Sequence, residues 1–311
     1  MKALVAADYL PLDRIAVTDH PTLTPGPGQV LIKVEAAALN PLDLALISGA
    51  AKDLYPVEHP MVVGMDAAGT VAEVGEGVSG YGPGDPVLAF TGQAGAVAQY
   101  TVASPGPRLA TRPEGLDSVH AAAIPESGLT AVCLLRAVRL AAGESVLVVG
   151  ATGGIGLYAV QLAHALGARV IATSTAEDEK YLRGLGAAET VEYKNADVVE
   201  QTLRLTPDGV DVVVDLINSG EQVASTARAA RPGGRLVSPL FGPGDLGRDV
   251  SPVYIGPFQA EPGDLEDLAA RAADGRLRVE IGARYEFEDA PQAVLDFAQK
   301  HIRGKVVITV A

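Results

Sequence analysis

A cluster of glycines follows an apolar run rich in β-branched residues near the middle of the chain, in the order SVLVVGATGGIG. Its members Gly150, Gly153, Gly154 and Gly156 leave the backbone open to close approach by a ligand. Apolar residues with helical spacing follow, so the segment predicts a strand, a tight turn and a helix. The first N–H groups of such a helix are unpaired and attract phosphate. This turn, with Ile155, therefore predicts a pyrophosphate site.

The neighbouring sequence supplies the setting that a dinucleotide site needs. The helical pattern stops at Gly167, and residues 168–173 form a second buried strand, which completes a unit of about 30 residues. Ala151 takes the place of the first glycine of the dinucleotide fingerprint, and Gly153 and Gly156 keep the other two. Further parallel strands are predicted, with helical patterns between them, at 190–193, 210–216 and 234–239. The simplest topology that fits this order of elements is a doubly wound parallel sheet of the α/β class, that is, a Rossmann domain.

Three hydroxyl side chains, Thr173, Ser174 and Thr175, lie where the second strand ends. An NAD-binding unit places an acid there, which hydrogen-bonds the ribose 2′-OH. Hydroxyls can donate to a 2′-phosphate, whereas a carboxylate would repel it, and Lys180 and Tyr193 are candidates to complete that pocket. The pattern favours NADPH (NADP+) over NADH as the cofactor. The alternative is that Lys180 only solvates a helix.

Composition limits the class of protein. The 311 residues are 48% hydrophobic, enough for two domains. A net charge of −14 disfavours nucleic acid and anionic membranes as partners. No apolar run approaches the roughly 18 to 20 residues of a membrane span, and the opening MKALVAADYLP lacks a signal-peptide pattern, so we expect a cytoplasmic protein. The single Cys133 lies in an apolar pattern and is expected to be a packed thiol.

The beginning of the chain has a different pattern from the middle. Short apolar segments alternate with Pro/Gly turns and predict a β-rich, barrel-like unit, with strands at 1–6, 30–38, 69–74, 86–90 and 96–102. Helical spacing occurs at 40–49 and 117–124, and a long helix is predicted from Gly128.

The end of the chain returns to the first pattern. A strand at 253–258 and a helix at 265–273 precede a segment of short strands with one helix at 291–301. We therefore predict a discontinuous domain, 1–121 with 261–311, and a cofactor domain at 122–260. Pairing of two exposed edge strands at 253–258 would make a homodimer.

Five motifs follow one another over nearly the whole chain. They are ALNPLDLALISG (38–49), HPMVVGMDAAGTVAEVGEGVSGYGPGDPV (59–87), AAAIPESGLTAV (121–132), the glycine-turn unit (146–173) and RGKVVITV (303–310). In their order and spacing they resemble the zinc-free quinone oxidoreductases, the zeta-crystallin-like branch of the medium-chain dehydrogenase/reductase superfamily. The resemblance implies a Rossmann cofactor domain and a β-rich, GroES-like catalytic domain.

The zinc-dependent members of this superfamily have ligands that this chain lacks. They use a Cys in the loop corresponding to residues 40–43 and a His-Glu pair where Met65 and Asp66 stand here. Tetrahedral zinc needs several N or S ligands, and one cysteine cannot supply the four-cysteine zinc lobe. The resemblance therefore implies no metal site. His59 lies near this region and is interpreted as a solvated loop histidine.

Without a metal, the substrate must be polarised by hydrogen bonds, which suits quinones and α,β-unsaturated carbonyl compounds. The leading hypothesis is hydride transfer from NADPH to such an acceptor, with the reactants held face to face. One alternative is an enoyl-thioester or polyketide-type enoyl reductase. Another is a non-catalytic NADPH-binding sensor or structural protein.

The resemblance also implies roles for single residues. Asn40 would donate to the nicotinamide or the substrate, or else cap a turn or helix. Tyr55 would hydrogen-bond the acceptor or deliver a proton, or else only pack. Thr130 would contact the nicotinamide ribose or face, or else cap the helix entry, and Asp66 is given no catalytic role beyond receiving backbone donors.

Two more cofactor-binding candidates, Asn218 and Phe241, follow strands of the predicted sheet at their carboxyl ends. Ligands gather at that edge in such folds.

Overall fold

The computed structural model describes residues 1–255 and 259–310. It divides into two compact units. Met1–Ser127 and Glu261–Ala311 form the first, here called the β-rich unit. Gly128–Ala260 forms the second, here called the parallel-sheet unit.

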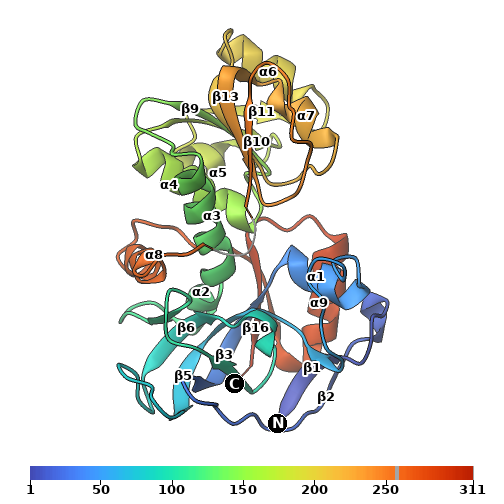
Figure 1. Ribbon diagram of the computed structural model, residues 1–311, viewed down its shortest axis with the longest axis vertical. Coiled ribbons are helices and arrows are strands. Elements are labelled where there is room, and N and C mark those ends of the chain that lie inside the picture. Colours follow the sequence, from blue (N-terminus) through green and yellow to red (C-terminus); the bar gives the residue numbers. More distant parts are fainter. Residues whose placement is uncertain (256–258, 311) are drawn as a thin grey trace. The chain divides into compact units, whose positions relative to one another are not determined.

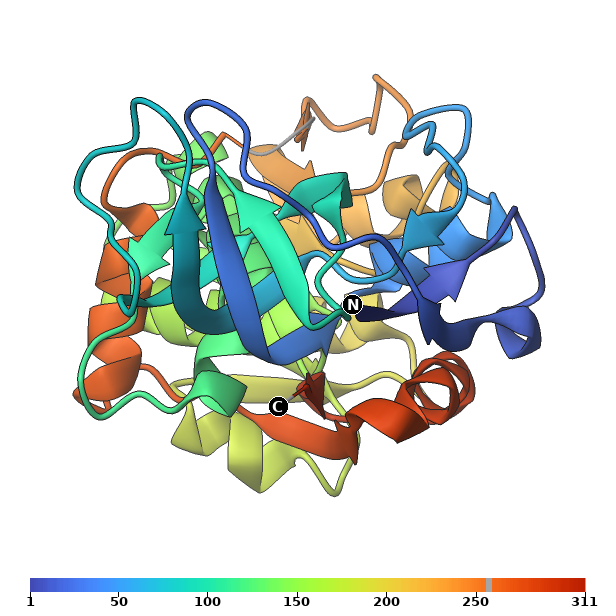
Figure 2. The ribbon, with the colours of Figure 1, turned by 90° about the horizontal axis from the view of Figure 1, so that it is seen from below.

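A sheet of seven strands organises the β-rich unit (Figure 2). Its order is β15-β16-β3-β5-β6-β8, and β7 also pairs with β3. The strands are β3 (Val30–Leu39), β5 (Asp66–Val74), β6 (Pro86–Phe90), β7 (Tyr100–Ala103), β8 (Leu109–Thr111), β15 (Ile281–Glu286) and β16 (Lys305–Thr309).

The register of this sheet brings three strand ends together. β3 runs antiparallel to both β5 and β16, with Ala38 opposite Asp66 and Leu39 opposite Val306. The end of β3 therefore lies between the first residue of β5 and the first residue of β16, Lys305. Helix α1 (Pro41–Ser48) begins directly after this point.

A second, three-stranded sheet and several helices complete the β-rich unit. The small sheet has the order β2-β1-β4, formed by β1 (Lys2–Ala6), β2 (Ala16–Asp19) and β4 (Met61–Val62). Helices α2 (Ser118–Ala122), α8 (Asp264–Ala273) and α9 (Ala290–Gln299) accompany the 3-10 turns η1 (Leu12–Arg14), η2 (Gly92–Ala94) and η3 (Phe287–Asp289). Of these, α2 packs against β3, β5 and β16.

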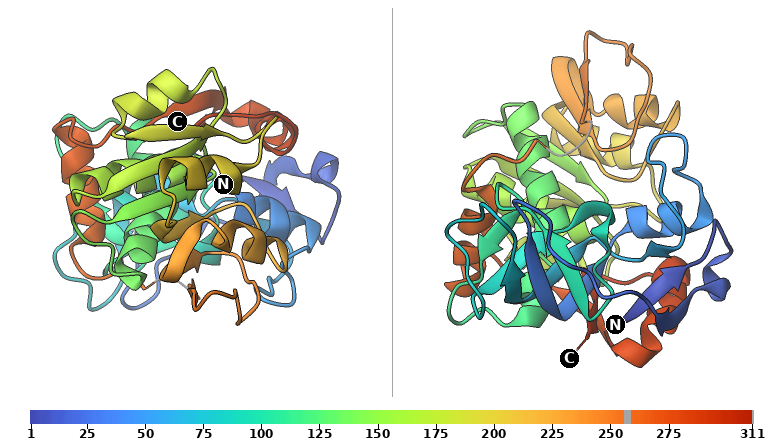
Figure 3. Two further views of the ribbon diagram at one scale, coloured as in Figure 1. Left: turned by 90° about the horizontal axis from the view of Figure 1, so that it is seen from above. Right: turned by 60° about the horizontal axis from the view of Figure 1, so that its bottom comes forward.

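The parallel-sheet unit contains six strands in the order β11-β10-β9-β12-β13-β14, all paired in parallel (Figures 1 and 3). The order reverses at β9, which lies between β10 and β12. The strands are β9 (Ser145–Val149), β10 (Arg169–Ser174), β11 (Glu189–Glu192), β12 (Val210–Asp215), β13 (Ala230–Ser238) and β14 (Ser251–Tyr254). This is the predicted doubly wound Rossmann topology.

Helices connect these strands in sequence. α4 packs on β9 and β10, α5 packs on β10 and β11, and α6 packs against α7. The bounds are α4 (Gly154–Ala165), α5 (Glu179–Gly184), α6 (Val198–Leu205) and α7 (Gln222–Ala227). Helix α3 (Pro125–Ala137) comes before β9, and its residues up to Ser127 belong to the β-rich unit. Buried aliphatic side chains such as Leu147, Ile171 and Val213 form the core of the sheet.

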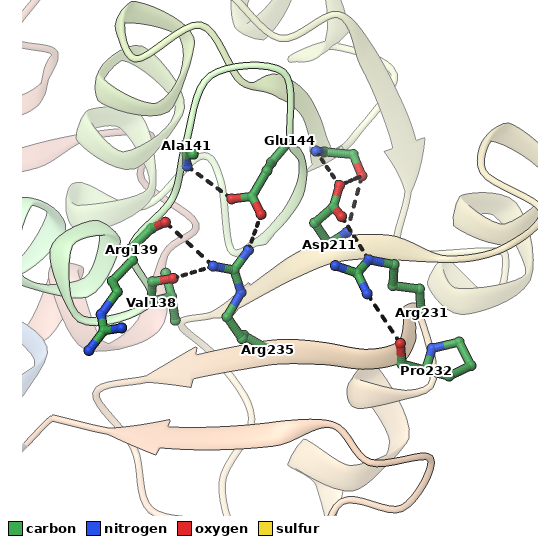
Figure 4. A network of polar contacts seen from close by, with 9 residues as sticks. Val138, Arg139, Ala141, Glu144, Asp211, Arg231, Pro232 and Arg235 are labelled. Atoms are coloured by element: carbon green, nitrogen blue, oxygen red, sulfur yellow. Dashed lines mark hydrogen bonds and ion pairs between the residues drawn. The ribbon is translucent and has the colours of Figure 1, made fainter.

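Two arginines of the parallel-sheet unit form a polar network (Figure 4). Arg235 Nη1 donates to the Val138 carbonyl at 2.6 Å, and its Nη2 pairs with Glu144. Arg231 Nε donates to Asp211 Oδ1 at 2.7 Å. The network joins the segment that follows α3 to the sheet.

Several predicted boundaries were wrong. The helix predicted from Gly128 begins at Pro125, where proline fits the first helical turn. The single strand predicted at 96–102 is divided: Ala96 bonds the Val63 carbonyl, and only Tyr100–Ala103 pairs with β3. Strand 253–258 begins earlier as β14, and residues 256–258 of that prediction lie outside the described residues. None of the described helices has the length and apolar content needed to cross a membrane.

Candidate functional site

The glycine turn lies at the carboxyl end of β9. Gly150 has φ +85°, a left-handed conformation that favours glycine, and the Gly153 N–H donates to its carbonyl at 3.2 Å. Gly153 is the N-cap residue of α4, so Gly154 and Ile155 begin that helix. A Cβ on Gly156 would lie 2.1 Å from the Gly150 carbonyl oxygen, so only glycine fits there.

The ends of β10 and β11 lie beside this turn. The Gly150 N–H donates to Thr173 Oγ1 at 2.9 Å, and the Tyr193 N–H donates to the Ser174 carbonyl at 3.3 Å. The Thr175 hydroxyl donates to Asp178 Oδ2 at 2.9 Å, so that hydroxyl already has an acceptor. Lys180 is exposed on α5. The structure thus brings Ser174 and Tyr193 together at this edge of the sheet.

Asn218 and Phe241 follow β12 and β13 at the same edge. Asn218 Nδ2 donates to Asp215 Oδ2 at 2.9 Å, and the Gly220 N–H donates to the Phe241 carbonyl at 2.7 Å. Half of the Phe241 surface is exposed, and its ring centroid lies 6.4 Å from that of Tyr254. The segments that follow β12 and β13 are therefore hydrogen-bonded to each other, and the exposed ring of Phe241 is accessible to a ligand.

Thr130 is buried within α3. Because that helix begins at Pro125, the interpretation of Thr130 as a cap of the helix entry is wrong. The interpretation of His59 as a solvated loop histidine is also wrong. Its ring packs edge-on against Tyr9 with centroids 4.6 Å apart, and its Nε2 is buried without a hydrogen-bond partner.

The two residues predicted to be catalytic, Asn40 and Tyr55, both belong to the β-rich unit. Tyr55 is half-buried in the turns that follow α1. Asn40 is fully buried at the N-cap position of α1, but its side chain bonds other elements. Its Nδ2 donates to Asp66 Oδ2 at 2.9 Å, and its Oδ1 accepts from Lys305 Nζ.

Asn40 is one member of a buried group of six polar side chains, here called the Lys305 cluster. From β16, Lys305 Nζ also donates to Ser127 Oγ at 3.1 Å and lies 3.5 Å from Asp66 Oδ2. The Ser127 hydroxyl donates to Glu126 Oε2 at 3.0 Å. The members are Asn40, Asp43, Asp66, Glu126, Ser127 and Lys305, each at most 8% exposed.

The carboxyl groups of the cluster share one electrostatic property. Burial, opposed by the hydrogen bond from the Asn40 N–H and by Lys305, raises the pKa of Asp43 to about 8. Burial likewise raises the pKa of Glu126 to about 7 against the attraction of Lys305, and it raises the pKa of Asp66. Burial therefore shifts all three carboxyls towards their protonated forms, and the shift to about 8 at Asp43 keeps that carboxyl protonated at neutral pH.

Sequence reasoning missed most of this cluster. It assigned Asp66 only backbone donors, and Asp66 Oδ1 does accept the Glu126 N–H at 2.9 Å. Lys305, Glu126, Ser127 and Asp43 were not predicted as site residues. One signal was available, because Lys305 opens an otherwise apolar strand, KVVITV, where a lone cation needs partners.

Two family matches agree with the two units. Residues 26–113 match the alcohol dehydrogenase GroES-like domain, and residues 154–251 match the family described as zinc-binding dehydrogenase. Within residues 1–255 and 259–310, no group of three or more His, Cys, Asp or Glu side chains is arranged to hold a metal ion.

Several known proteins are similar along most of their length. A quinone oxidoreductase from Pseudomonas aeruginosa is 33% identical, over 93% of this chain and 94% of its own. One from Rattus norvegicus is 31% identical over 89% and 87%. The structure of the quinone oxidoreductase from Coxiella burnetii has a TM-score of 0.90 at 29% identity, covering 100% of this chain and 99% of its own. Mycobacterial Rv1454c, solved in complex with NADPH, has a TM-score of 0.87 at 30% identity and full coverage of both chains.

Proposed function

Because the chain belongs to the quinone oxidoreductase branch of the medium-chain dehydrogenase/reductase superfamily, we propose that it transfers hydride from NADPH to a quinone or an α,β-unsaturated carbonyl compound, without zinc. The family makes the chain an oxidoreductase. The choice of NADPH over NADH rests on one observation. The glycine turn stands where the strand order reverses, beside a strand end that presents Ser174 rather than an acid.

The residues at this edge fit a dinucleotide. The N–H groups of Gly154 and Ile155 open α4 and would hold the pyrophosphate, and Gly156 keeps the space beside it free of a side chain. Ser174, Lys180 and Tyr193 would surround the 2′-phosphate. Thr130, Asn218 and Phe241 would contact the nicotinamide half. When bound, NADPH supplies the hydride from the nicotinamide C4.

The cofactor proposal is tested by titrating NADPH and NADH against the wild type and Lys180→Ala. We expect Lys180→Ala to weaken NADPH binding by about tenfold, equal to about 1.4 kcal/mol, and to leave NADH binding unchanged. Arg204→Ala is the control, since Arg204 is an exposed cation of the same unit, paired with Glu200. An unchanged preference for NADPH in Lys180→Ala would show that the 2′-phosphate lies elsewhere.

Asn40 and Tyr55 are proposed to act on the acceptor. Asn40 has a second hydrogen on Nδ2 beside the one given to Asp66, and Tyr55 carries a hydroxyl that can donate. We expect Tyr55→Phe to lower kcat/KM by about a hundredfold, because the acceptor oxygen loses a hydrogen-bond donor. Tyr9→Phe is the control, because its ring contact with His59 needs no hydroxyl. If the wild type and Tyr55→Phe had equal kcat/KM, the Tyr55 hydroxyl would have no role in the reaction and the side chain would only pack.

Zinc independence is supported by the donor set. Asn40, Asp43, Met65 and Asp66 stand where the zinc relatives have ligands, and the ammonium of Lys305 lies among the nearby carboxyls. We expect purified protein to contain less than stoichiometric zinc and to keep its kcat after chelation. Loss of kcat on chelation, with recovery on adding zinc, would contradict this.

A panel of acceptors separates the proposal from its alternatives. NADPH oxidation with 1,2- or 1,4-quinones or simple enones supports the proposed reaction. A higher kcat/KM for enoyl thioesters supports the enoyl reductase instead. Tight NADPH binding without turnover over the whole panel supports a sensor or structural protein.

The homodimer is proposed through the exposed edge of β14, the last strand of the parallel sheet. Light scattering of the wild type should give twice the mass of the chain, and Val253→Lys should give the monomer. A cytoplasmic location stays a prediction from the sequence.

A further inference from the structure

The Lys305 cluster contains more carboxyl groups than its one cation can neutralise. Asp43, Asp66 and Glu126 would carry three negative charges against the single ammonium of Lys305. Two uncompensated charges on side chains this deeply buried are strongly unfavourable. Neutrality is restored when two of the three carboxyls carry protons.

The charge interactions that shift the pKa values of Asp43, Asp66 and Glu126 are with members of the cluster, chiefly Lys305. His120 of α2 is exposed and bonded to Asp117. On α9, Asp296 pairs with Lys300 and accepts from Tyr285. The charge balance is therefore decided among Asp43, Asp66, Glu126 and Lys305.

Hydrogen bonds indicate which carboxyls hold the protons. Asp66 accepts from three groups, the Asn40 side chain, the Glu126 N–H and Lys305 Nζ, and is the best stabilised as a carboxylate. Asp43 accepts only the Asn40 N–H at its Oδ2, and its Oδ1 is buried without a partner. The side chain of Glu126 accepts from Ser127.

A chain of hydrogen bonds links Glu126 through Ser127 and Lys305 to Asn40 and Asp66. Ser127 Oγ receives a hydrogen from Lys305 and gives its own to Glu126, while Lys305 also holds Asn40 Oδ1. A proton can pass along this chain from Lys305 through Ser127 to Glu126 once Glu126 is a carboxylate, because the Lys305 ammonium can only donate. Glu126 is its most exposed carboxyl, at 8%.

We propose that the Lys305 cluster is a proton store, in which Asp43 and Glu126 hold protons and Glu126 releases one for each hydride transferred. This rests in part on the proposed function. Hydride transfer would add one hydrogen and two electrons to the acceptor, so the acceptor would become an anion that needs one proton. The O–H bond of Glu126 breaks as an O–H or C–H bond forms on the acceptor. The Glu126 carboxylate then regains a proton from water.

The stored protons are detected without turnover by infrared spectroscopy of the whole protein between about pH 5 and about pH 9. We expect carboxylic acid bands that shift in deuterium oxide, one lost in Asp43→Asn and one in Glu126→Gln. These variants imitate the protonated acids and should fold. Asp296→Asn is the control, because Lys300 and Tyr285 stabilise the Asp296 carboxylate. A spectrum without buried carboxylic acid at neutral pH would overturn the proposal.

The release step is tested by rapid mixing of the NADPH complex with a quinone in weak buffer and a pH-indicator dye. We expect wild-type hydride transfer to precede proton uptake from water, and this delay to disappear in Glu126→Gln. Simultaneous hydride transfer and proton uptake in the wild type would overturn the release step. If no acceptor supported NADPH oxidation, the proposed reaction would be refuted instead. The infrared bands would still test whether Asp43 and Glu126 are protonated.

Discussion

Arg235 of the parallel-sheet unit and Lys305 of the β-rich unit each bind several oxygens, in opposite surroundings. Arg235 and Arg231 face one carboxylate each, Glu144 and Asp211, and these side chains are between 23% and 43% exposed (Figure 4). Lys305 is 4% exposed among three carboxyls. In the first network each carboxylate has its own cation and both are partly exposed, whereas in the second three buried carboxyls share one cation.

The same residue type responds in opposite directions in the two networks. Burial raises the pKa of Asp211, but hydrogen bonds from Ser145 and Arg231 outweigh it and hold that pKa below its ordinary value. At Asp43, burial dominates and the pKa rises to about 8. A carboxyl group next to a cation therefore stays ionised only where enough cations and hydrogen-bond donors surround it to balance its negative charge.

Removing the one cation of the buried network should have the largest effect. We expect Lys305→Met to lower the free energy of unfolding by roughly 3 to 5 kcal/mol, because a buried carboxylate loses its counter-ion. The loss should be smaller in acid, where Asp66 can take up a proton. Urea unfolding measures it. Lys300→Met, which removes a 62% exposed lysine from its ion pair with Asp296, should cost at most about 1 kcal/mol. Equal losses in both variants would contradict the comparison.

The protonated state of Asp43 predicts the sign of a pH dependence. Its pKa is raised from 3.8 to about 8, so the native protein keeps a proton that the unfolded chain has released. This contribution is complete below about pH 4 and is lost as the pH rises through about 8, with a slope of up to about 1.4 kcal/mol per pH unit. We expect Asp43→Asn to remove that slope in urea unfolding.

The control for this pH dependence has the opposite sign. Asp296, whose pKa is lowered to about 2 by hydrogen bonds from Lys300, Tyr285 and Gln292, contributes stability that is lost as the pH falls below about 4. Asp296→Asn should therefore change only the acid limb of the stability curve. A wild-type curve that is flat between about pH 4 and 8 would contradict the protonated state of Asp43.

In the exposed network, Arg235→Met should have an intermediate effect. It removes charge-assisted hydrogen bonds to the Val138 carbonyl and to Glu144, which we expect to cost about 2 kcal/mol in thermal or urea unfolding. Arg204→Met, at a single exposed pair with Glu200, should cost less than about 0.5 kcal/mol. A cost for Arg235→Met as small as that of the control would show that the carbonyl contact contributes nothing.

The smallest effect is expected at Arg231. Arg231→Met removes one half-exposed pair with Asp211, and we expect a loss of about 0.5 to 1 kcal/mol. Screening predicts that this loss shrinks in about 1 M salt, whereas that of Lys305→Met does not. If salt reduced both losses equally, water and ions would have to reach the Lys305 cluster.

The parallel-sheet unit was predicted well because its signals are local. A β-branched run, a glycine turn and a helical stripe lie within one short segment, and β9, α4 and β10 follow them. The contacts of Asn40 could not be found in this way. Its partners Asp66 and Lys305 come from strands that pair only in the folded sheet, and no local pattern specifies that register.

Errors at element boundaries have a similar cause. The segment at 96–102 has one continuous strand pattern, but Ala96 bonds to Val63 while Tyr100 pairs with Lys33 of β3. Both halves of the segment have the same β-strand propensity, and only their different pairing partners in the folded protein separate them into two elements.

The position of β16 beside β3 has a consequence for synthesis on the ribosome. Lys305 is 265 residues away from Asn40, and the complete parallel-sheet unit is encoded between them. That unit can finish folding while residues 36–39 of β3 still await their partner strand, so an unpaired sheet margin persists during translation. Chaperones that shield nascent β-structure should therefore engage the first unit to emerge and release it last.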